Sequence, residues 1–284
     1  MARKGHSVVR VTTVVDNTTQ GRMLLGENGL ALWVEADDTR ILFDTGQGAV
    51  LSGNAHKLHI RLEDTDTIVL SHGHYDHTGG LVTAIRAAGR PRVAAHPVAF
   101  RPKFATRYDG TGREVGILYF NEDSIREKVS ELVFTEGPAQ LAEHIYVTGE
   151  VPRVNAYEDT GGHFFLDRKC TKCDPLIDDQ ALYIETPNGT VVLLGCAHAG
   201  VVNTLRYVQT LTGGKRILAV IGGMHLTRAS HERMAQTIAD LRTLDIGHFY
   251  PAHCTGLAGA AMLWSAFPGR VTPCMVGTVA EFCV

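Results

Sequence analysis

Thr67-Ile68-Val69-Leu70-Ser71-His72-Gly73-His74-Tyr75-Asp76-His77 is the segment from which the architecture of this 284-residue chain can be inferred. Its β-branched start predicts a short buried strand, and the polar residues behind it then form a loop at the strand's carboxyl end, where α/β proteins place ligand sites. Burial does not explain three histidines in six residues, whereas imidazole and carboxylate are good ligands for divalent ions. Alternate residues of an extended turn point to one side, so His72 and His74 can share one ion. Asp76 and His77 can then turn toward a neighbouring ion.

The rest of the chain predicts strands interleaved with helices in two batches. Hydrophobic runs predict strands over 8–15, 30–35, 40–43, 67–70, 92–95, 181–185, 191–194, 217–221, 248–250 and 270–274. Helical spacing and end signals predict helices over 79–88, 201–211, 230–244 and 257–266. Pro187-Asn188-Gly189 predicts a hairpin turn. We therefore expect two similar α/β halves whose sheets face each other in a single domain spanning 1–284, with a cap or insertion at about 97–175 that carries a hinge at Gly161-Gly162.

Other motifs also follow strands: Phe43-Asp44-Thr45-Gly46, Gly195-Cys196-Ala197-His198-Ala199-Gly200, Ile221-Gly222-Gly223-Met224-His225-Leu226 and Pro251-Ala252-His253-Cys254-Thr255-Gly256. With the histidine-rich loop, they resemble the metal-binding motifs of the metallo-β-lactamase superfamily of metallohydrolases. More narrowly, they and Asp178-Asp179-Gln180-Ala181-Leu182 resemble a subgroup that includes the dihydropterin-ribofuranosylaminobenzene phosphate synthases. The resemblance implies an α/β fold, a four-layer αββα sandwich with metal ions at one edge.

The same resemblance implies roles for individual residues. It gives as metal ligands His72, His74, Asp76, His77, Cys196, His198 and His253, and as catalytic residues Asp76, His225 and Asp44. Asp44 is expected to support the metal loop. The family's usual Gly-His-x-x-Gly is missing, and Asp178-Asp179 stands in its place, so His198 is expected to replace a first-site ligand. Cys196 could coordinate, bridge or merely pack.

His225 has three open roles: proton donor to the leaving group, third metal ligand, or phosphate contact. His96 ends a strand and could approach the same pocket. Arg101, Lys103 and Arg107 form a basic stretch that is either a solvated face or a clamp for a substrate phosphate.

The expected function is metal-dependent hydrolysis. Divalent ions make hydroxide available at neutral pH and polarise the electrophile. We expect two ions, zinc with iron and manganese as alternatives, that present a metal-bound hydroxide to a phosphoester or a cyclic ester. One alternative is a metal-dependent transferase that resembles the pterin synthase and condenses a hydroxymethylpterin diphosphate with a phosphorylated aryl riboside. The other is a non-enzymatic, metal-loaded ligand-binding protein.

Composition limits the partners and the compartment. Lys+Arg 27 against Asp+Glu 30 gives a formal charge of -3, which argues against nucleic acid or an anionic membrane as a general partner. We expect a small-molecule substrate, with or without a phosphate group. The apolar runs are far shorter than the roughly 20 residues that span a bilayer. Residues 1–6 lack the apolar region of a signal peptide, so we expect a cytoplasmic protein with six reduced cysteines. Cys170 and Cys173 are then a polar loop with two thiols, or a redox or metal pair. The sequence does not indicate an oligomeric state.

Overall fold

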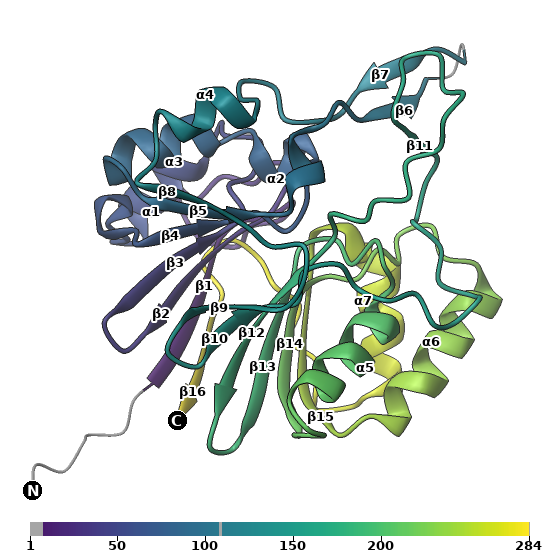
Figure 1. The fold of residues 1–284 in the computed structure, drawn as a ribbon. Coiled ribbons are helices and arrows are strands. Elements are labelled where there is room, and N and C mark those ends of the chain that lie inside the picture. The colour runs from purple at the N-terminus through teal and green to yellow at the C-terminus, as the bar shows by residue number, and fades with distance from the viewer. Residues whose placement is uncertain (1–7, 108–109, 284) are drawn as a thin grey trace, which may run out of the picture.

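Two mixed sheets lie face to face, and helices cover both outer sides (Figure 1). The computed structural model describes residues 8–107 and 110–283, so the expectation for residues 1–6 lies outside the described residues. In order across the first sheet, its strands are β16 (Val279–Cys283), β1 (Val8–Val15), β2 (Ala31–Ala36), β3 (Thr39–Phe43), β4 (Thr67–Val69), β5 (Arg92–Ala95) and β8 (Glu131–Phe134). Those of the second sheet are β15 (Ile246–Ala252), β14 (Ile217–Gly223), β13 (Gly189–Leu194), β12 (Ala181–Thr186), β10 (Ile145–Val147) and β9 (Ala139–Ala142).

The helices form the two outer layers. The first sheet is covered by α1 (Leu51–Lys57), α3 (Leu81–Ala88) and α4 (Glu122–Arg126). The second sheet is covered by α5 (Val201–Leu211), α6 (His231–Thr243) and α7 (Gly256–Ala266). The short helix α2 (Tyr75–Thr78) contains part of the histidine-rich loop. This arrangement confirms the predicted four-layer αββα sandwich.

Strand alternation explains how one sheet serves two cores. On β12, Leu182 and Ile184 pack into the core between the sheets, while Ala181 and Tyr183 pack under the outer helices. Successive side chains of a strand point to opposite faces, so a strand buried on both faces is apolar almost throughout. For this reason the apolar runs of β12, β13 and β14 predict strands from the sequence alone.

The predicted strand over 270–274 is wrong. The segment runs beside β15 but forms only an isolated bridge, between Val271 and Phe249, among the described residues. The N–H groups of Thr272 and Cys274 donate to the carbonyls of Phe249 and Pro251, but Pro251 has no N–H with which to complete the ladder. The last strand is instead β16, which pairs antiparallel with β1.

Only part of the segment expected to be a cap lies outside the two main sheets. β8 adjoins β5 in the first sheet, and β9 and β10 complete an edge of the second. Separate from these, β6 (Phe104–Thr106), β7 (Gly112–Glu114) and β11 (Phe164–Phe165) form a small sheet, called the arm below, that projects from the sandwich (Figure 1). The strands β8 and β9 lie at sheet edges, and Leu141 is the one fully buried residue in the two strands, so neither forms a continuous apolar run.

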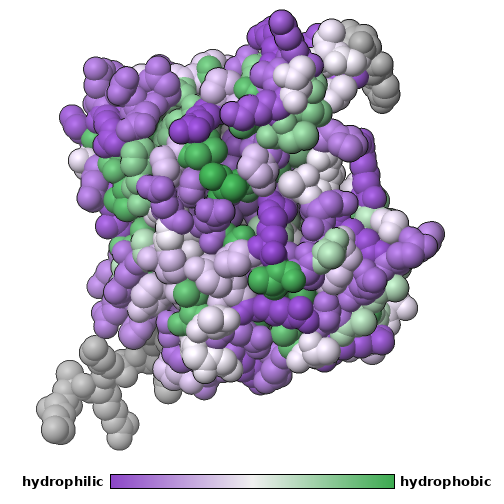
Figure 2. Space-filling view, turned by 45° about the vertical axis from the view of Figure 1, so that its right-hand side comes forward, coloured by the Kyte–Doolittle hydropathy of each residue, from purple (hydrophilic) through white to green (hydrophobic). Residues whose placement is uncertain are grey.

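The outer surface is mainly polar. In the face shown in Figure 2, hydrophilic residues predominate and hydrophobic residues form small, separated groups. Among the described residues, none of the helices combines the length and apolar character that a bilayer crossing requires.

Candidate metal centre

The candidate ligands lie on loops at the carboxyl ends of neighbouring strands. The histidine-rich loop follows β4, while Cys196 and His198 follow β13, and His225 and His253 follow β14 and β15. Several residues at these strand ends have left-handed backbone angles, with φ of 60° at Asp44, 49° at His225 and 46° at His253. Such conformations are costly and cluster at functional sites. The fold thus gathers the motifs of both halves at one edge of the sandwich.

One ligand group joins the two halves of the molecule. The donor atoms of His72, His74 and His198 all lie within 4.8 Å of one another, and all three side chains are buried. His72 Nε2 and His74 Nδ1 are 3.0 Å apart. Burial, followed by neighbouring histidines or Lys103, holds the pKa of all three imidazoles well below its usual value. They are therefore neutral, which is the form that binds a metal ion.

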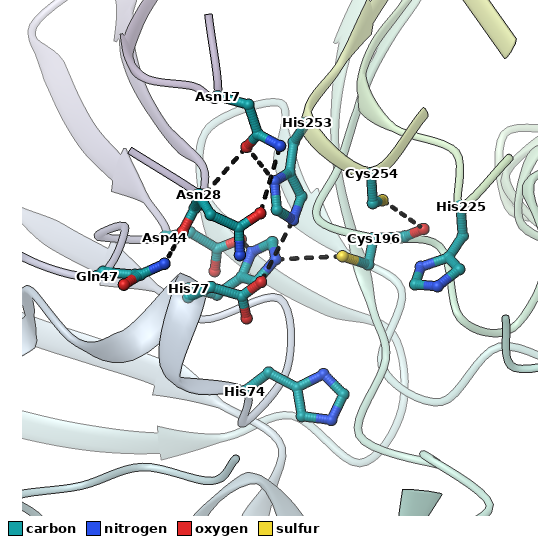
Figure 3. Close-up of polar contacts among 12 residues, drawn as sticks. Asn17, Asn28, Asp44, Gln47, His74, His77, Cys196, His225, His253 and Cys254 are labelled. Atoms are coloured by element: carbon teal, nitrogen blue, oxygen red, sulfur yellow. Dashed lines mark hydrogen bonds and ion pairs between the residues drawn. The ribbon is translucent and has the colours of Figure 1, made fainter. Parts of the chain in front are cut away.

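A second group lies beside the first. Asp76, His77 and His253 also offer donor atoms within 4.8 Å of one another, and His253 Nε2 lies 3.5 Å from Asp76 Oδ2. His77 Nε2 is 3.2 Å from Cys196 Sγ, and Cys196 forms a group with His72 and His77 as well (Figure 3). Cys196 therefore lies between the two sets of histidines, in a position from which its sulfur can reach both.

The outward-facing nitrogen of most of these imidazoles contacts a hydrogen-bond acceptor. Nδ1 of His77 lies 2.7 Å from Asp44 Oδ2, that of His253 lies 2.8 Å from Asn17 Oδ1, and that of His198 lies 2.7 Å from the carbonyl oxygen of Thr160. Ser71 Oγ donates its single proton to Asp44 Oδ2 at 2.6 Å. Toward His72 Nδ1, 2.9 Å away, the same hydroxyl can therefore act only as an acceptor. Metal-binding histidines are characteristically fixed in this way.

These contacts leave lone pairs directed inward. In the part of the chain that the structure describes, the buried Nε2 atoms of His74 and His198 have no hydrogen-bond partner. A buried polar atom without a partner is costly, and a bound cation would remove that cost. Burial lowers the pKa of His77, but the charge of Asp44 and its hydrogen bond outweigh this and raise it to about 9. The unpartnered nitrogens of His74 and His198, with the carboxylate and sulfur donors beside them, fit divalent ions and support metal binding.

Asp178 and Asp179, at the place of the missing motif, support the loops instead of joining the ligand groups. Asp178 Oδ2 accepts from the backbone N–H of Gly73, between the first two histidines, at 2.8 Å. Asp179 Oδ2 accepts from the N–H of Ala199 at 2.8 Å. The sequence drew attention to the pair but did not reveal this role. It also gave no signal for Ser71, Asn17 and Thr160 as partners of the histidines, because those contacts are made across the fold.

The basic stretch of Arg101, Lys103 and Arg107 forms neither a single solvated face nor a clamp. Lys103 is fully buried, with Nζ 3.0 Å from Asp174 Oδ2 and 2.8 Å from Asp178 Oδ1. Of the three basic residues, only Arg107 lines the large cavity described below. His96 is buried, and its Nδ1 accepts from the N–H of Val98 as a helix cap.

The CxxC segment lies near the arm, where Cys173 is exposed and makes a backbone bridge with Phe165. All six cysteines are free thiols.

A cavity of about 880 Å³ opens between the arm and the end of the second sheet. His225 and Cys254 line it on the side of the sandwich, and Phe164 lines it on the side of the arm. Three arginines also line it: Arg107, Arg113 and Arg228. None of the three forms an ion pair with a described residue. A smaller adjoining cavity of about 260 Å³ reaches Asp76, His198 and His253.

Comparisons with known proteins agree with this geometry. The family model of the metallo-β-lactamase superfamily matches residues 25–253. The chain is 29% identical over 270 residues to the 7,8-dihydropterin-6-methyl-4-(β-D-ribofuranosyl)-aminobenzene-5'-phosphate synthase of Methanocaldococcus jannaschii, covering 90% of both chains. It is 31% identical over 255 residues to an uncharacterised protein of the same organism, covering 89% of this chain and 93% of that protein.

A solved structure is similar over almost the whole molecule. The crystal structure of Tm1679, described as a metal-dependent hydrolase of the β-lactamase superfamily, superposes with a TM-score of 0.83 at 27% identity. The match covers 97% of this chain and 100% of that one. The histidine-rich loop, the ligand groups at one edge of two facing sheets and the family match lead to one conclusion: the chain belongs to the metallo-β-lactamase superfamily.

Proposed function

We propose that the protein is a metal-dependent hydrolase of small anionic esters, either phosphoesters or cyclic esters. The observation that carries the proposal is the cavity of about 880 Å³, which three arginines line, together with the adjoining cavity that reaches Asp76, His198 and His253. Arg113 belongs to strand β7 of the arm and Arg228 follows β14 of the sandwich, and neither forms an ion pair with a described residue. The cavity falls in the range of about 300–1,000 Å³ that is typical of small-molecule sites.

Different residues of the chain would hold the two ions, orient their ligands and bind the substrate. His72, His74 and His198 would hold one ion, while Asp76, His77 and His253 would hold a second, with Cys196 between them. When bound, such ions lower the pKa of water and polarise an ester. Asp44 would keep His77 oriented through its 2.7 Å contact. The guanidinium groups of Arg113 and Arg228 would hold the anionic part of the substrate, because arginine matches phosphate geometry with paired donors.

A metal-dependent transferase is the second candidate. It is favoured by the likeness to the pterin synthase over 90% of both chains. By its name, that enzyme's product carries a pterin, an aminobenzene ring and a ribose phosphate, so the large cavity with Phe164 and three arginines would suit both types of group. Enzyme activity in general is supported by the superfamily and by this relative.

The test begins with metal content. Protein purified without added metal is analysed beside His74→Ala and His56→Ala, the latter changing an exposed histidine of α1. We expect at least about two ions per chain in the wild type, a marked fall in His74→Ala and no change in His56→Ala. Equal metal content in all three, or none in the wild type, would refute the metal centre.

Activity is then measured with phosphodiesters, phosphomonoesters and lactones. Arg228→Ala should lower kcat/KM for the anionic substrate about 10–100-fold by removing a charge-assisted hydrogen bond, whereas the exposed Arg86→Ala should not. Coupling of a pterin diphosphate to an aryl riboside phosphate without ester hydrolysis would establish the transferase instead. Metal-loaded protein that turns over none of these compounds would overturn both enzyme proposals.

A further inference from the structure

A third set of donors lies beside the two ligand groups. Cys196, His225 and Cys254 present donor atoms that all lie within 4.8 Å of one another. They follow β13, β14 and β15, which are neighbouring parallel strands, so the register of the sheet places them together. Cys254 Sγ also lies 3.6 Å from the carbonyl oxygen of Cys196 (Figure 3).

His225 makes the contacts of a ligand. Its Nε2 lies 3.2 Å from the carbonyl oxygen of Gly161, which can only accept a hydrogen bond. Nε2 therefore carries the proton and Nδ1 carries a lone pair. Among the described residues, the buried Nδ1 has no N–H or O–H partner, and the polar group that it faces is the thiol of Cys254. His198 has the equivalent arrangement against the preceding carbonyl, that of Thr160.

The backbone conformation of Gly161 and its lack of a side chain make this contact possible. Its φ is 74°, and a Cβ at this position would lie 1.7 Å from Cδ2 of His225. Only glycine allows the loop to approach the imidazole so closely. The loop beside the arm thus orients two neighbouring imidazoles, His198 in the first ligand group and His225 in the third set.

We propose that Cys196, His225 and Cys254 form a further metal site, for a soft or borderline ion such as Zn²⁺, with the sulfur of Cys196 shared with the histidine groups. Two sulfur ligands and one imidazole are the donors that such ions prefer. His225 and Cys254 line the large cavity, so a fourth coordination position would open toward the substrate. Of the three roles that the sequence left open for His225, this proposal selects that of metal ligand.

The proposal rests on the proposed function only through Cys196, and the two can fail separately. Metal-free, full-length protein is titrated with Cd²⁺ in the presence of a reductant, and ultraviolet absorption reports cadmium–thiolate bonds. Variants are Cys254→Ser, His225→Gln and His74→Ala. Cys274→Ser is the matched control, because Cys274 is buried and belongs to none of the ligand groups among the described residues. Circular dichroism checks that each variant is folded.

We expect Cys254→Ser and His225→Gln to bind one fewer Cd²⁺, or to bind the last ion at least about tenfold more weakly. Cys254→Ser should also lose thiolate absorption, while Cys274→Ser matches the wild type. His74→Ala should lose other ions but keep the absorption that depends on Cys254. If Cys254→Ser and His225→Gln bind as the wild type does while His74→Ala does not, the further site is refuted and the histidine centre stands.

Two further outcomes are also decisive. If His74→Ala binds as the wild type does while Cys254→Ser loses an ion, the further site stands and the histidine centre falls. If mass spectrometry finds a Cys196–Cys254 disulfide and the reduced pair shows no Cd²⁺-dependent absorption, the pair is a redox element and the metal proposal is overturned.

Discussion

Replacing Lys103 with methionine should destabilise the protein strongly. Lys103 Nζ contacts Asp174 and Asp178, and all three side chains are at most 1% exposed. Among the described residues, each carboxylate keeps one backbone donor on its other oxygen, Leu176 N for Asp174 and Gly73 N for Asp178. Methionine is close to lysine in length and apolar, so packing is largely preserved while the cation is removed.

The expected magnitude follows from what the substitution leaves behind. Removing one partner of a buried ion pair costs about 3–5 kcal/mol because the remaining charge is uncompensated. Here two carboxylates lose the same cation, so we expect a loss of at least about 3 kcal/mol in the free energy of unfolding. A typical domain has only about 5–15 kcal/mol in total.

The assay is urea unfolding of the purified protein, followed by fluorescence and circular dichroism. Lys169→Met, at an exposed lysine, should change stability by no more than about 0.5 kcal/mol. The triple variant Lys103→Met, Asp174→Asn, Asp178→Asn should recover most of the loss, since amides keep acceptors for both backbone donors but carry no charge. A loss below about 1 kcal/mol for Lys103→Met, or no recovery in the triple variant, would refute the reasoning.

Three other substitutions and reactions test separate features. Asp44→Asn should weaken metal affinity about 10–100-fold in a chelator competition, because the amide no longer holds His77 with a charge; unchanged affinity would exclude the orienting role. Gly161→Ala should lower the free energy of unfolding by more than about 1 kcal/mol in thermal unfolding, because Gly161 has a positive φ and its Cβ would collide with His225. Gly53→Ala is the control: Gly53 lies in α1 with open space around it, so this change should stabilise the protein. Burial raises the pKa of the Cys274 thiol to about 12. Iodoacetamide at about pH 8, close to the ordinary pKa of a thiol, should therefore alkylate the exposed Cys283 before Cys274. Equal alkylation rates in peptide mass spectrometry would contradict the burial of Cys274.

The histidine-rich loop shows how much of the site is local. Three imidazoles and a carboxylate follow a three-residue strand, and the chain direction alone places them at a carboxyl end. The apolar runs of the central strands likewise predicted two packed sheets, because strands buried on both faces need apolar residues at every position. For these reasons the fold, the superfamily and the candidate ligands could be recognised from residue order.

Edge strands and long-range partners could not be recognised in this way. The edge strands β8 and β9 contain one fully buried residue between them, Leu141, and β16 is defined by its pairing with β1. Lys103 is buried because it pairs with two aspartates that lie more than 70 residues away in the sequence. A basic residue near a predicted pocket gives no local sign of whether it faces substrate or a buried carboxylate.

Residue order therefore specified which side chains could bind metal, since local patterns determine strands, loops and donor types. It did not specify which donors meet. The grouping of Cys254 with Cys196 and His225, and the carbonyl contacts that leave His198 and His225 with inward lone pairs, exist only after two sheets and the loop at 160–161 have packed together. Coordination depends on distances of a few ångströms between residues remote in sequence, and those distances are properties of the packed fold.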